Sequence, residues 1–383
     1  RFPPPASPTP SESSASSRWV VVTSINSPTP SMHLLDNLPG WQVVVIGDLK
    51  SASRGSTAAA WAPLSSTTYL DVDAQLAWAT DTGLHTPHLL PFDHYARKNI
   101  GYLYAVAHGA TVVYDTDDDN LLEEIVDSAD PEAWFAPPVL RAGEASILRP
   151  AAASSPVVNP LAAFGRPDVW PRGFPLTRLA EAAHVDAQPS AADIRVAVSQ
   201  LLAAQDPDTD AIFRLTRPHD VGNVWFDTTK PPGVLPPGVL APVNSQATVF
   251  QHNALWGLLI PVSVSFRVCD IWRGYWMQRL LWDLQSTVAV LPKAVVHDRN
   301  EHDYVADFAD EIQLYLGAHH LVDALAESWA TPKPVETTAQ FFEDALRLTV
   351  WLHDLGFWGA EQVRLTAAWL RDLHALGYRV AEA

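Results

Sequence analysis

Residues 92–120 read FDHYARKNIGYLYAVAHGATVVYDTDDDN, and the elements that they predict indicate the class of fold. The first part, 92–108, predicts a helix that starts near Asp93. Residues 110–115 then predict a strand, which runs directly into the acidic cluster Asp117–Asp119. A helix followed at once by a strand is typical of α/β proteins, whose ligands bind at the carboxyl ends of the strands.

The residues that precede this stretch predict the same alternation. Residues 19–26 (WVVVTSIN) predict a buried strand, 31–38 a helix and 41–50 (WQVVVIGDLK) a second strand. We therefore expect an α/β fold with a mostly parallel sheet flanked by helices. Ser24 and Asp48 follow the carboxyl ends of two of its strands, as the acidic cluster follows the third. These side chains are expected to meet at one edge of the sheet.

The rest of the chain predicts further strands and then a helical C-terminal extension. The predicted elements are a helix at 191–204, a strand at 211–216, a proline-rich loop at 230–242, short strands around a turn at 246–265, a helix at 268–285, a strand at 287–296, and helices at 304–328, 337–354 and 360–376. Gly356 and Gly377 are expected to end the last two helices. The predicted divisions are a disordered stalk at 1–18, an α/β domain at 19–300 and the extension at 301–383.

Composition excludes several classes of protein. Of the 383 residues, 48% are hydrophobic and 18% are charged, so the chain as a whole is not disordered. A net charge of −18 argues against unspecific binding to nucleic acid or to anionic membranes. The single cysteine, Cys269, excludes an internal disulfide and a zinc–cysteine cluster.

The composition of the N-terminal residues bears on whether the chain was attached to a membrane. Residues 1–18 are rich in Pro, Ser and Thr and are predicted not to fold. No run of 18 apolar residues is present, and the first residue is Arg1 rather than Met. A stalk of this kind fits a fragment of a single-pass membrane protein whose anchor is missing from this chain, and it also fits an ordinary disordered tail.

The acidic cluster is the candidate metal site. Asp117 and Asp119, at i and i+2 after a strand, can both turn toward one Mn²⁺ or Mg²⁺, with a diphosphate completing the coordination shell. Asp115 is an alternative to Asp117, and His297 at the end of a later strand is a candidate third ligand. The alternatives are a solvated acidic loop or an N-cap cluster for a helix that begins near Leu121.

Other charged residues have competing interpretations. Asp208 and Asp210 form a second acidic pair, which precedes its predicted strand and so favours a structural or substrate-side role. Arg97 and Lys98 are candidates for binding a nucleotide diphosphate, although surface salt bridges are the commoner role for such a pair. Asp270 is a candidate general base, but an ion pair with Arg273 one turn later is the simpler interpretation.

Four stretches together resemble the STELLO family of Golgi glycosyltransferase-like proteins, which are of the GT-A type. They are PFDHYARKNIGYLYAVAHGA (91–110), WPRGFPL (170–176), WRGYWMQRLLWDL (272–284) and FWGAEQVRLTAAWLRDL (357–373). The chain is more distantly similar to the reversibly glycosylated polypeptides, the UDP-arabinopyranose mutases. That similarity lies in DDDN (117–120), QDPDTDA (205–211), DIWRGYW (270–276) and His297.

The resemblance implies a role for each candidate residue. Asp117, Asp119 and His297 would hold the metal, and Asp270 would face the sugar or the acceptor. The nucleotide site implied by the resemblance and by the strand ends comprises Ser24, Asp48, Arg97, Lys98 and Asp118. The mutases also carry an arginine that accepts sugar, and Arg166 and Arg172 lie in the comparable stretch. Because Asn120 departs from the mutase pattern and the helical tail follows STELLO, the resemblance favours transfer over mutase chemistry.

The function implied by the resemblance is metal-dependent transfer of a sugar from a nucleotide-sugar, expected to be a UDP-sugar, to a glycan or another hydroxyl acceptor. It also implies that residues 19–300 form a GT-A-like, nucleotide-sugar-binding catalytic domain, and that the protein resides in the Golgi lumen as part of a type II membrane protein. The alternatives are a non-catalytic Golgi scaffold that assists assembly of a polysaccharide synthase, and a UDP-sugar mutase. A homodimer is left open as the assembly.

Overall fold

The computed structural model describes residues 17–122, 135, 138–152, 155–297, 303–330 and 335–380. The predicted stalk at 1–18 lies outside the described residues except for its last two positions. Within the described part of the chain, no helix has both the length and the apolar character needed to cross a membrane.

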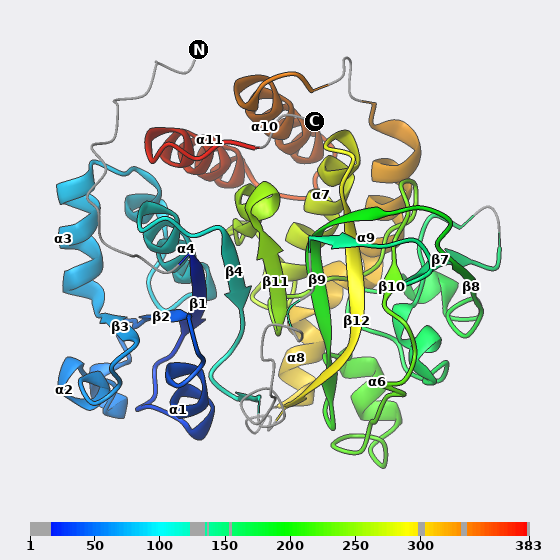
Figure 1. Cartoon of the computed structure of the whole chain (residues 1–383), viewed down its shortest axis with the longest axis horizontal. Helices are drawn as coiled ribbons and strands as arrows, with labels where there is room; N and C mark the ends of the chain where they lie inside the picture. The colour runs from blue at the N-terminus through cyan, green and yellow to red at the C-terminus, as the bar shows by residue number, and fades with distance from the viewer. Residues whose placement is uncertain are drawn as a thin grey trace.

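Twelve strands in the described residues form one sheet that crosses the molecule (Figure 1). Their order is β3-β2-β1-β4-β11-β9-β12-β10-β7-β8, with β5 paired to β12 and β6 paired to β9. The strands are β1 (Arg18–Thr23), β2 (Gln42–Ile46), β3 (Thr67–Leu70), β4 (Val112–Asp115), β5 (Asn120–Leu121), β6 (Val139–Leu140), β7 (Ser146–Pro150), β8 (Val185–Pro189), β9 (Ile194–Ala204), β10 (Gly233–Val234), β11 (Thr248–Gln251) and β12 (Thr287–His297).

The expected α/β fold with flanking helices is confirmed, and its sheet combines parallel and antiparallel strands. Strands β3, β2, β1 and β4 are parallel, as are β9 and β12. Strand β11 is antiparallel to both β4 and β9 because the loop before it, residues 244–247, enters the sheet at the edge where β4 ends. Despite this reversal, β1, β2, β4, β9 and β12 all end at the same edge of the sheet.

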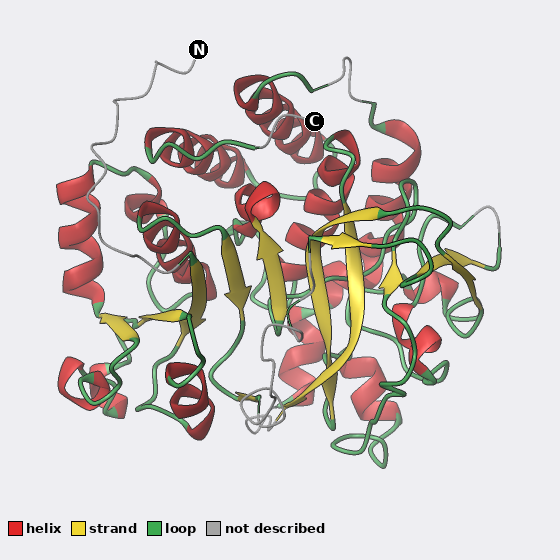
Figure 2. Cartoon of the chain, in the orientation of Figure 1, coloured by secondary structure: helices red, strands yellow, loops and turns green. Residues whose placement is uncertain are grey.

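Helices cover both faces of the sheet (Figure 2). They are α1 (Pro30–Asp36), α2 (Ala58–Trp61), α3 (Val72–Thr82), α4 (Lys98–Ala107), α6 (Ala211–Thr216), α7 (Cys269–Asp283), α8 (Tyr304–Asp310), α9 (Ile312–Asp323), α10 (Thr338–Asp354) and α11 (Ala360–Ala375). Short 3₁₀ turns are η1 (Ala52–Arg54), η2 (Thr86–Leu89), η3 (Tyr95–Arg97), η5 (Pro160–Phe164), η6 (Leu176–Arg178) and η7 (His252–Leu258), and η8 (Ala324–Ser328) is a π-helical turn.

Alternating side chains of β1 divide the interior into two cores. Val20 and Val22 pack with Met32 of α1 on one face, whereas Val21 packs with Ile100 of α4 on the other. All three valines are fully buried, as expected for a central parallel strand that is covered on both sides. The run of β-branched residues in the sequence therefore results from burial on two faces.

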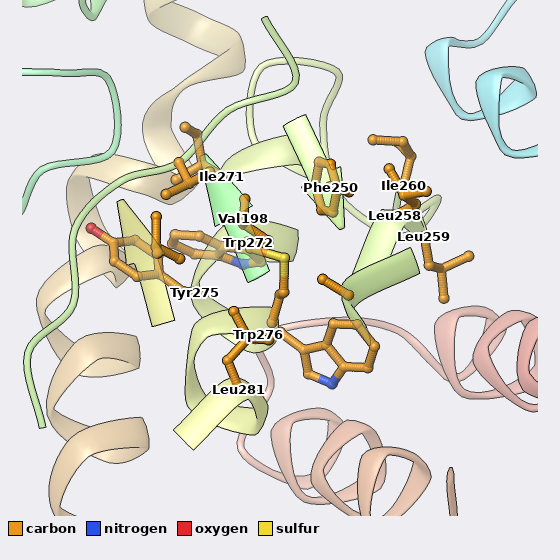
Figure 3. Close-up of a cluster of buried hydrophobic side chains, with 14 of the residues drawn as sticks. Val198, Phe250, Leu258, Leu259, Ile260, Ile271, Trp272, Tyr275, Trp276 and Leu281 are labelled. Atoms are coloured by element: carbon orange, nitrogen blue, oxygen red, sulfur yellow. The ribbon is translucent and has the colours of Figure 1, made fainter. Parts of the chain in front are cut away.

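Helix α7 is the centre of the larger core (Figure 3). Trp272, Tyr275 and Trp276 of this helix are buried with Val198 of β9 and Phe250 of β11. Its first residues reach the edge of the sheet where β4 ends, because Arg273 forms an ion pair with Asp115 at 3.0 Å. Packing of α7 therefore positions the residues at its N-terminal end, including Asp270.

Two predicted elements are wrong. The range 191–204 contains the whole of the long strand β9 rather than a helix, and β9 lies between β11 and β12 with both faces largely buried. Residues 211–216 form helix α6 rather than a strand, because Asp210 caps its first turn through the Phe213 amide at 2.8 Å. A continuous apolar run fits either element, so periodicity could not separate them.

Most of the other predicted elements are confirmed within one or a few residues. The strands at 19–26, 41–50, 110–115 and 287–296 are β1, β2, β4 and β12, and the helices at 31–38 and 268–285 are α1 and α7. Helix α4 begins at Lys98, later than the predicted start, after the turn η3. The predicted strands at 246–265 reduce to β11 followed by η7. Gly356 and Gly377 follow α10 and α11 with positive φ.

Candidate functional site

A cleft of about 700 Å³ lies at the edge where the parallel strands end. Eight of the nine predicted site residues line it. These are Ser24, Asp48, Arg97, Asp117, Asp118, Asp119, Asp270 and His297. They come from the loops after β1, β2 and β4, from η3, from the start of α7 and from the end of β12. In Figure 1 the arrow of β4 points toward this edge.

The three carboxylates of the acidic cluster have different partners. Asp117 Oδ1 accepts hydrogen bonds from the Tyr95 hydroxyl at 2.9 Å and from Lys98 Nζ at 3.2 Å. Asp118 Oδ2 accepts one from Ser24 Oγ at 2.5 Å. Asp119 Oδ2 lies 3.4 Å from Nε2 of His297. The cluster is therefore built into the cleft wall, rather than being the freely solvated acidic loop of the alternative interpretation.

Burial and mutual repulsion disfavour the charged form of these acids. Burial raises the pKa of Asp117 to about 6; Lys98 lowers it, and Asp119 and Asp115 raise it. Burial also raises the pKa of Asp118, against the hydrogen bond from Ser24. A cation placed among these carboxylates would relieve the repulsion between them.

The chemistry of the donor set fits a divalent cation. Nδ1 of His297 donates a hydrogen bond to the Asp206 carbonyl at 2.7 Å, which leaves the Nε2 lone pair directed to the Asp119 side. A carboxylate beside an oriented imidazole is a common pair of metal ligands. In the part of the chain that the structure describes, no three His, Cys, Asp or Glu side chains are close enough to enclose an ion. The remaining ligands would have to come from Asp117 or from a bound diphosphate.

Asp115 is not available as the alternative ligand. Its side chain is fully buried, and Oδ1 is 2.7 Å from Lys98 Nζ and 2.8 Å from the Tyr102 hydroxyl, while Oδ2 pairs with Arg273. Asn120 and Leu121 form β5. The helix expected to begin near Leu121 would continue into residues 123–134, which lie outside the described residues.

Lys98 is the predicted site residue that does not line the cleft. Its side chain is fully buried behind the acidic cluster, where it contacts Asp115, Asp117 and the Thr116 carbonyl. In this position Lys98 compensates the charge of the strand end and orients Asp117. It is not placed to contact a ligand directly.

Asp270 is held by Arg172 rather than by Arg273. Nη1 and Nη2 of Arg172 donate to the two oxygens of Asp270 at 3.1 and 2.9 Å. The same guanidinium donates to Asp208 at 2.8 and 2.7 Å. The predicted ion pair between Asp270 and Arg273 is therefore wrong, because Arg273 points to Asp115 in β4.

The second acidic pair divides between two roles. Asp208 lines the cleft, whereas Asp210 caps α6 and accepts a hydrogen bond from Trp170 Nε1 at 2.7 Å. Of the two arginines considered as sugar acceptors, Arg172 is in the cleft. Arg166 is outside it and pairs with Asp168.

Asp48 and Arg97 lie at the β2 end of the cleft. Asp48 accepts hydrogen bonds from the amides of Leu49 at 2.8 Å and His94 at 3.1 Å. Arg97 is 1% exposed and is held by Gln75, whose Oε1 accepts from its Nε at 2.9 Å. Burial lowers the pKa of Arg97, and Asp48 opposes that shift. The Arg97 Nη1 has no hydrogen-bond partner among the described residues.

Several cleft residues had no clear signal in the sequence. Tyr95 joins Asp117 to Ser245, since its hydroxyl is 2.7 Å from Ser245 Oγ. The Ser245 amide in turn donates to Asp270 Oδ2 at 3.3 Å. Gln246 and Phe266 also line the cleft. Ser245, Gln246 and Phe266 lie in loops outside the stretches that carry the family resemblance, whereas Tyr95, Arg172 and Asp208 fall within those stretches.

Comparison with known proteins shows which sequences this chain is similar to. Residues 267–383 match the family model described as STELLO glycosyltransferases. Over 367 residues the chain is 34% identical to "Probable glycosyltransferase STELLO1" of Arabidopsis thaliana, and over 371 residues it is 35% identical to "Probable glycosyltransferase STELLO2" of the same plant. Each alignment covers 94% of this chain and 45% of the relative, so the chain spans less than half the length of the curated relatives that it matches.

Proposed function

We propose that the cleft of this chain, which is similar to the STELLO glycosyltransferases, binds a nucleotide-sugar, a UDP-sugar by resemblance, and transfers the sugar to a hydroxyl acceptor. The observation that carries the proposal is that Asp117 and Asp119, in the loop after β4, line the same cleft as His297 at the end of β12. Residence in the Golgi lumen is part of the same proposal and rests on the resemblance alone.

The donor would be held by two groups of residues. Asp119 and His297, completed by Asp117 or by oxygens of the diphosphate itself, would hold Mn²⁺ or Mg²⁺, which when bound would supply positive charge to neutralise the diphosphate. Arg97 can donate from Nη1 to the nucleotide without breaking its contacts to Gln75, and Asp48 can accept on the same side. Ser24 orients Asp118 beside them.

Asp270 would accept the proton of the acceptor hydroxyl if the reaction inverts the configuration of the sugar. Both of its oxygens are held by Arg172, so its orientation is fixed before an acceptor arrives. Accepting a proton would weaken one of these contacts. Arg172 would keep its two hydrogen bonds to Asp208, so the guanidinium would stay in place.

Calorimetric titration of UDP and GDP, each with Mn²⁺ and with EDTA, tests the proposal. We expect UDP to bind with Mn²⁺ and to lose at least about tenfold in affinity without it, about 1.4 kcal/mol. The variants Asp119→Asn and His297→Ala should show the same loss. Asp81→Asn, on the exposed surface of α3 and outside the cleft, is the matched control and should bind as the parent does.

Other outcomes of this titration separate the alternatives. If neither nucleotide binds under any condition, the proposal fails and the scaffold interpretation gains weight. If UDP binds equally with EDTA, the metal assignment is wrong. Interconversion of the sugar ring of a UDP-sugar in the absence of an acceptor would indicate mutase chemistry instead.

A further inference from the structure

Two polar side chains that line the cleft are more than nine-tenths buried and have an unsatisfied atom. Among the described residues, neither Nη1 of Arg97 nor Oε1 of Gln246 has a hydrogen-bond partner. A third such atom, Nη2 of Arg267, is 2.7 Å from the Glu311 carboxylate and so has an ionic partner. Arg97 is accounted for by the nucleotide end of the cleft, but no role has been assigned to Gln246.

Hydrogen bonds fix the backbone of Gln246, so the position from which its side chain extends is defined. The Gln246 carbonyl accepts hydrogen bonds from Gln200 Nε2 at 2.6 Å and from Thr248 Oγ1 at 3.2 Å, and its amide donates to Asn244 Oδ1 at 3.1 Å. These contacts leave the terminal amide of the side chain as the group that can still rotate.

Gln246 directly follows Ser245, which lies between the candidate metal site and the candidate base Asp270. Ser245 contacts Tyr95, which reaches Asp117 of the candidate metal site, and Ser245 also contacts Asp270, the candidate base. In a transfer reaction, the sugar must lie between the diphosphate and the acceptor. Gln246 therefore lines the cleft at the place where the transferred sugar would be bound.

An unpaired buried amide oxygen such as Oε1 of Gln246 is unfavourable in the ligand-free protein, because the atom has lost water without gaining a partner. A terminal amide both accepts and donates hydrogen bonds, and a sugar hydroxyl does the same. An apolar group would leave Oε1 unsatisfied, and an anionic oxygen has no hydrogen to donate to it. A neutral hydroxyl is the ligand group that matches.

We infer that Gln246 binds a hydroxyl group of the sugar of the nucleotide-sugar donor and contributes to the choice of that sugar. This inference rests on the proposed function, since it assigns a part of the same cleft. A site that pairs a buried polar group with a substrate hydroxyl discriminates strongly against analogues that lack the hydroxyl.

The test compares the affinities of UDP and of UDP-glucose, UDP-galactose and UDP-xylose, all with Mn²⁺, for the parent, Gln246→Leu and Gln246→Met. We expect UDP to bind all three proteins within about twofold. The best nucleotide-sugar should lose at least about tenfold in affinity relative to UDP in both variants. The ligand-free variants should melt at the same temperature as the parent or higher, because the unpaired amide is gone.

Gln278→Leu is the matched control. Its side chain is also buried, but both amide atoms are paired with the backbone of residues 241 and 274. This variant should melt at a lower temperature and keep the parent's ratio of nucleotide-sugar to UDP affinity. If that ratio is unchanged in both Gln246 variants, the inference about Gln246 is overturned and the proposed function is unaffected. If UDP does not bind the parent protein, the proposed function falls and the inference falls with it.

Discussion

Arg172 carries one positive charge between two carboxylates that are themselves nearly buried. Its side chain is 6% exposed, and those of Asp208 and Asp270 are 10% and 7% exposed. Burial alone would lower the pKa of Arg172, but Asp208 and Asp270 raise it well above its ordinary value. Each carboxylate depends on this guanidinium for its compensation, since the desolvation of a buried charge is costly without a partner.

Replacing Arg172 should therefore be much more destabilising than replacing an exposed arginine. Arg172→Met is expected to lower the free energy of unfolding by about 3–5 kcal/mol, because two buried carboxylates lose their main partner. Arg141→Met, which breaks the exposed pair with Asp193, should leave the free energy of unfolding nearly unchanged. Urea denaturation of both variants measures the difference. Equal effects would show that the buried network is not important for stability.

Asp210 makes the stability of the protein depend on pH. Burial raises its pKa to about 6, against its hydrogen bonds to Phe213 and Trp170. The folded protein therefore binds more protons than the unfolded chain between about pH 4 and 6, so this contribution to stability is present at low pH and is lost as pH rises through 6. Compared with Asp210→Asn, the parent should lose free energy of unfolding from pH 4.5 to 6.5 and then stay level. An increase with pH in the free energy of unfolding of the parent relative to Asp210→Asn would contradict this assignment.

At the scale of secondary-structure elements, close packing of α7 restricts its sequence. A Cβ atom on Gly274 would lie 2.3 Å from the backbone oxygen of Val243, so α7 and residue 243 approach more closely than any other amino acid permits. Gly274→Ala should lower the free energy of unfolding by about 1–3 kcal/mol, despite the better helix propensity of alanine.

Gly317→Ala is the comparison for that variant. Gly317 lies in α9, and its added Cβ would meet only the edge of the Trp272 ring, at 3.3 Å. Its effect on thermal unfolding should be smaller than that of Gly274→Ala. If the Gly274 variant is as stable as the parent, the close approach of α7 to residue 243 is not a constraint.

The elements also explain which parts of the site could be predicted. Ser24, Asp48 and Asp117 each follow a β-branched strand, and the carboxyl ends of parallel strands must meet at one edge, so their convergence follows from local sequence. Arg172 and Gln246 come from loops, and the sequence contains no rule for how those loops fold back. The strand β9 was missed because a strand buried on both faces has the same apolar run as a buried helix.

At the scale of the whole molecule, the C-terminal helices share the core of the sheet domain. Trp369 of α11 donates from Nε1 to the carbonyl of Trp256 at 2.8 Å, and Phe341 of α10 packs edge-to-face on the Trp256 ring. Asp372 of α11 also accepts hydrogen bonds from the amides of His85 and Thr86 in the N-terminal half. The domain boundary predicted at residue 300 stays a prediction. The described helices after it and the sheet before it share one hydrophobic core.

This continuity predicts that the described helices and the sheet unfold together. Trp369→Ala should lower the free energy of unfolding by about 3–5 kcal/mol and shift one transition as a whole. Circular dichroism, which follows the backbone, and tryptophan fluorescence should give the same midpoint before and after the substitution. Two separated transitions, of which only one moves, would mean that the C-terminal helices fold independently.

The first turn of α7 contains a buried cysteine next to the cleft. Cys269, the single cysteine of the sequence, immediately precedes Asp270, and burial raises the pKa of its thiol to about 12. The thiol is thus unreactive while the turn is closed, and a thiol-specific reagent can modify it only when the turn opens. The rate at which a thiol-specific reagent modifies Cys269 therefore measures how often this turn opens. A ligand bound in the adjacent cleft that holds the turn closed would slow the modification.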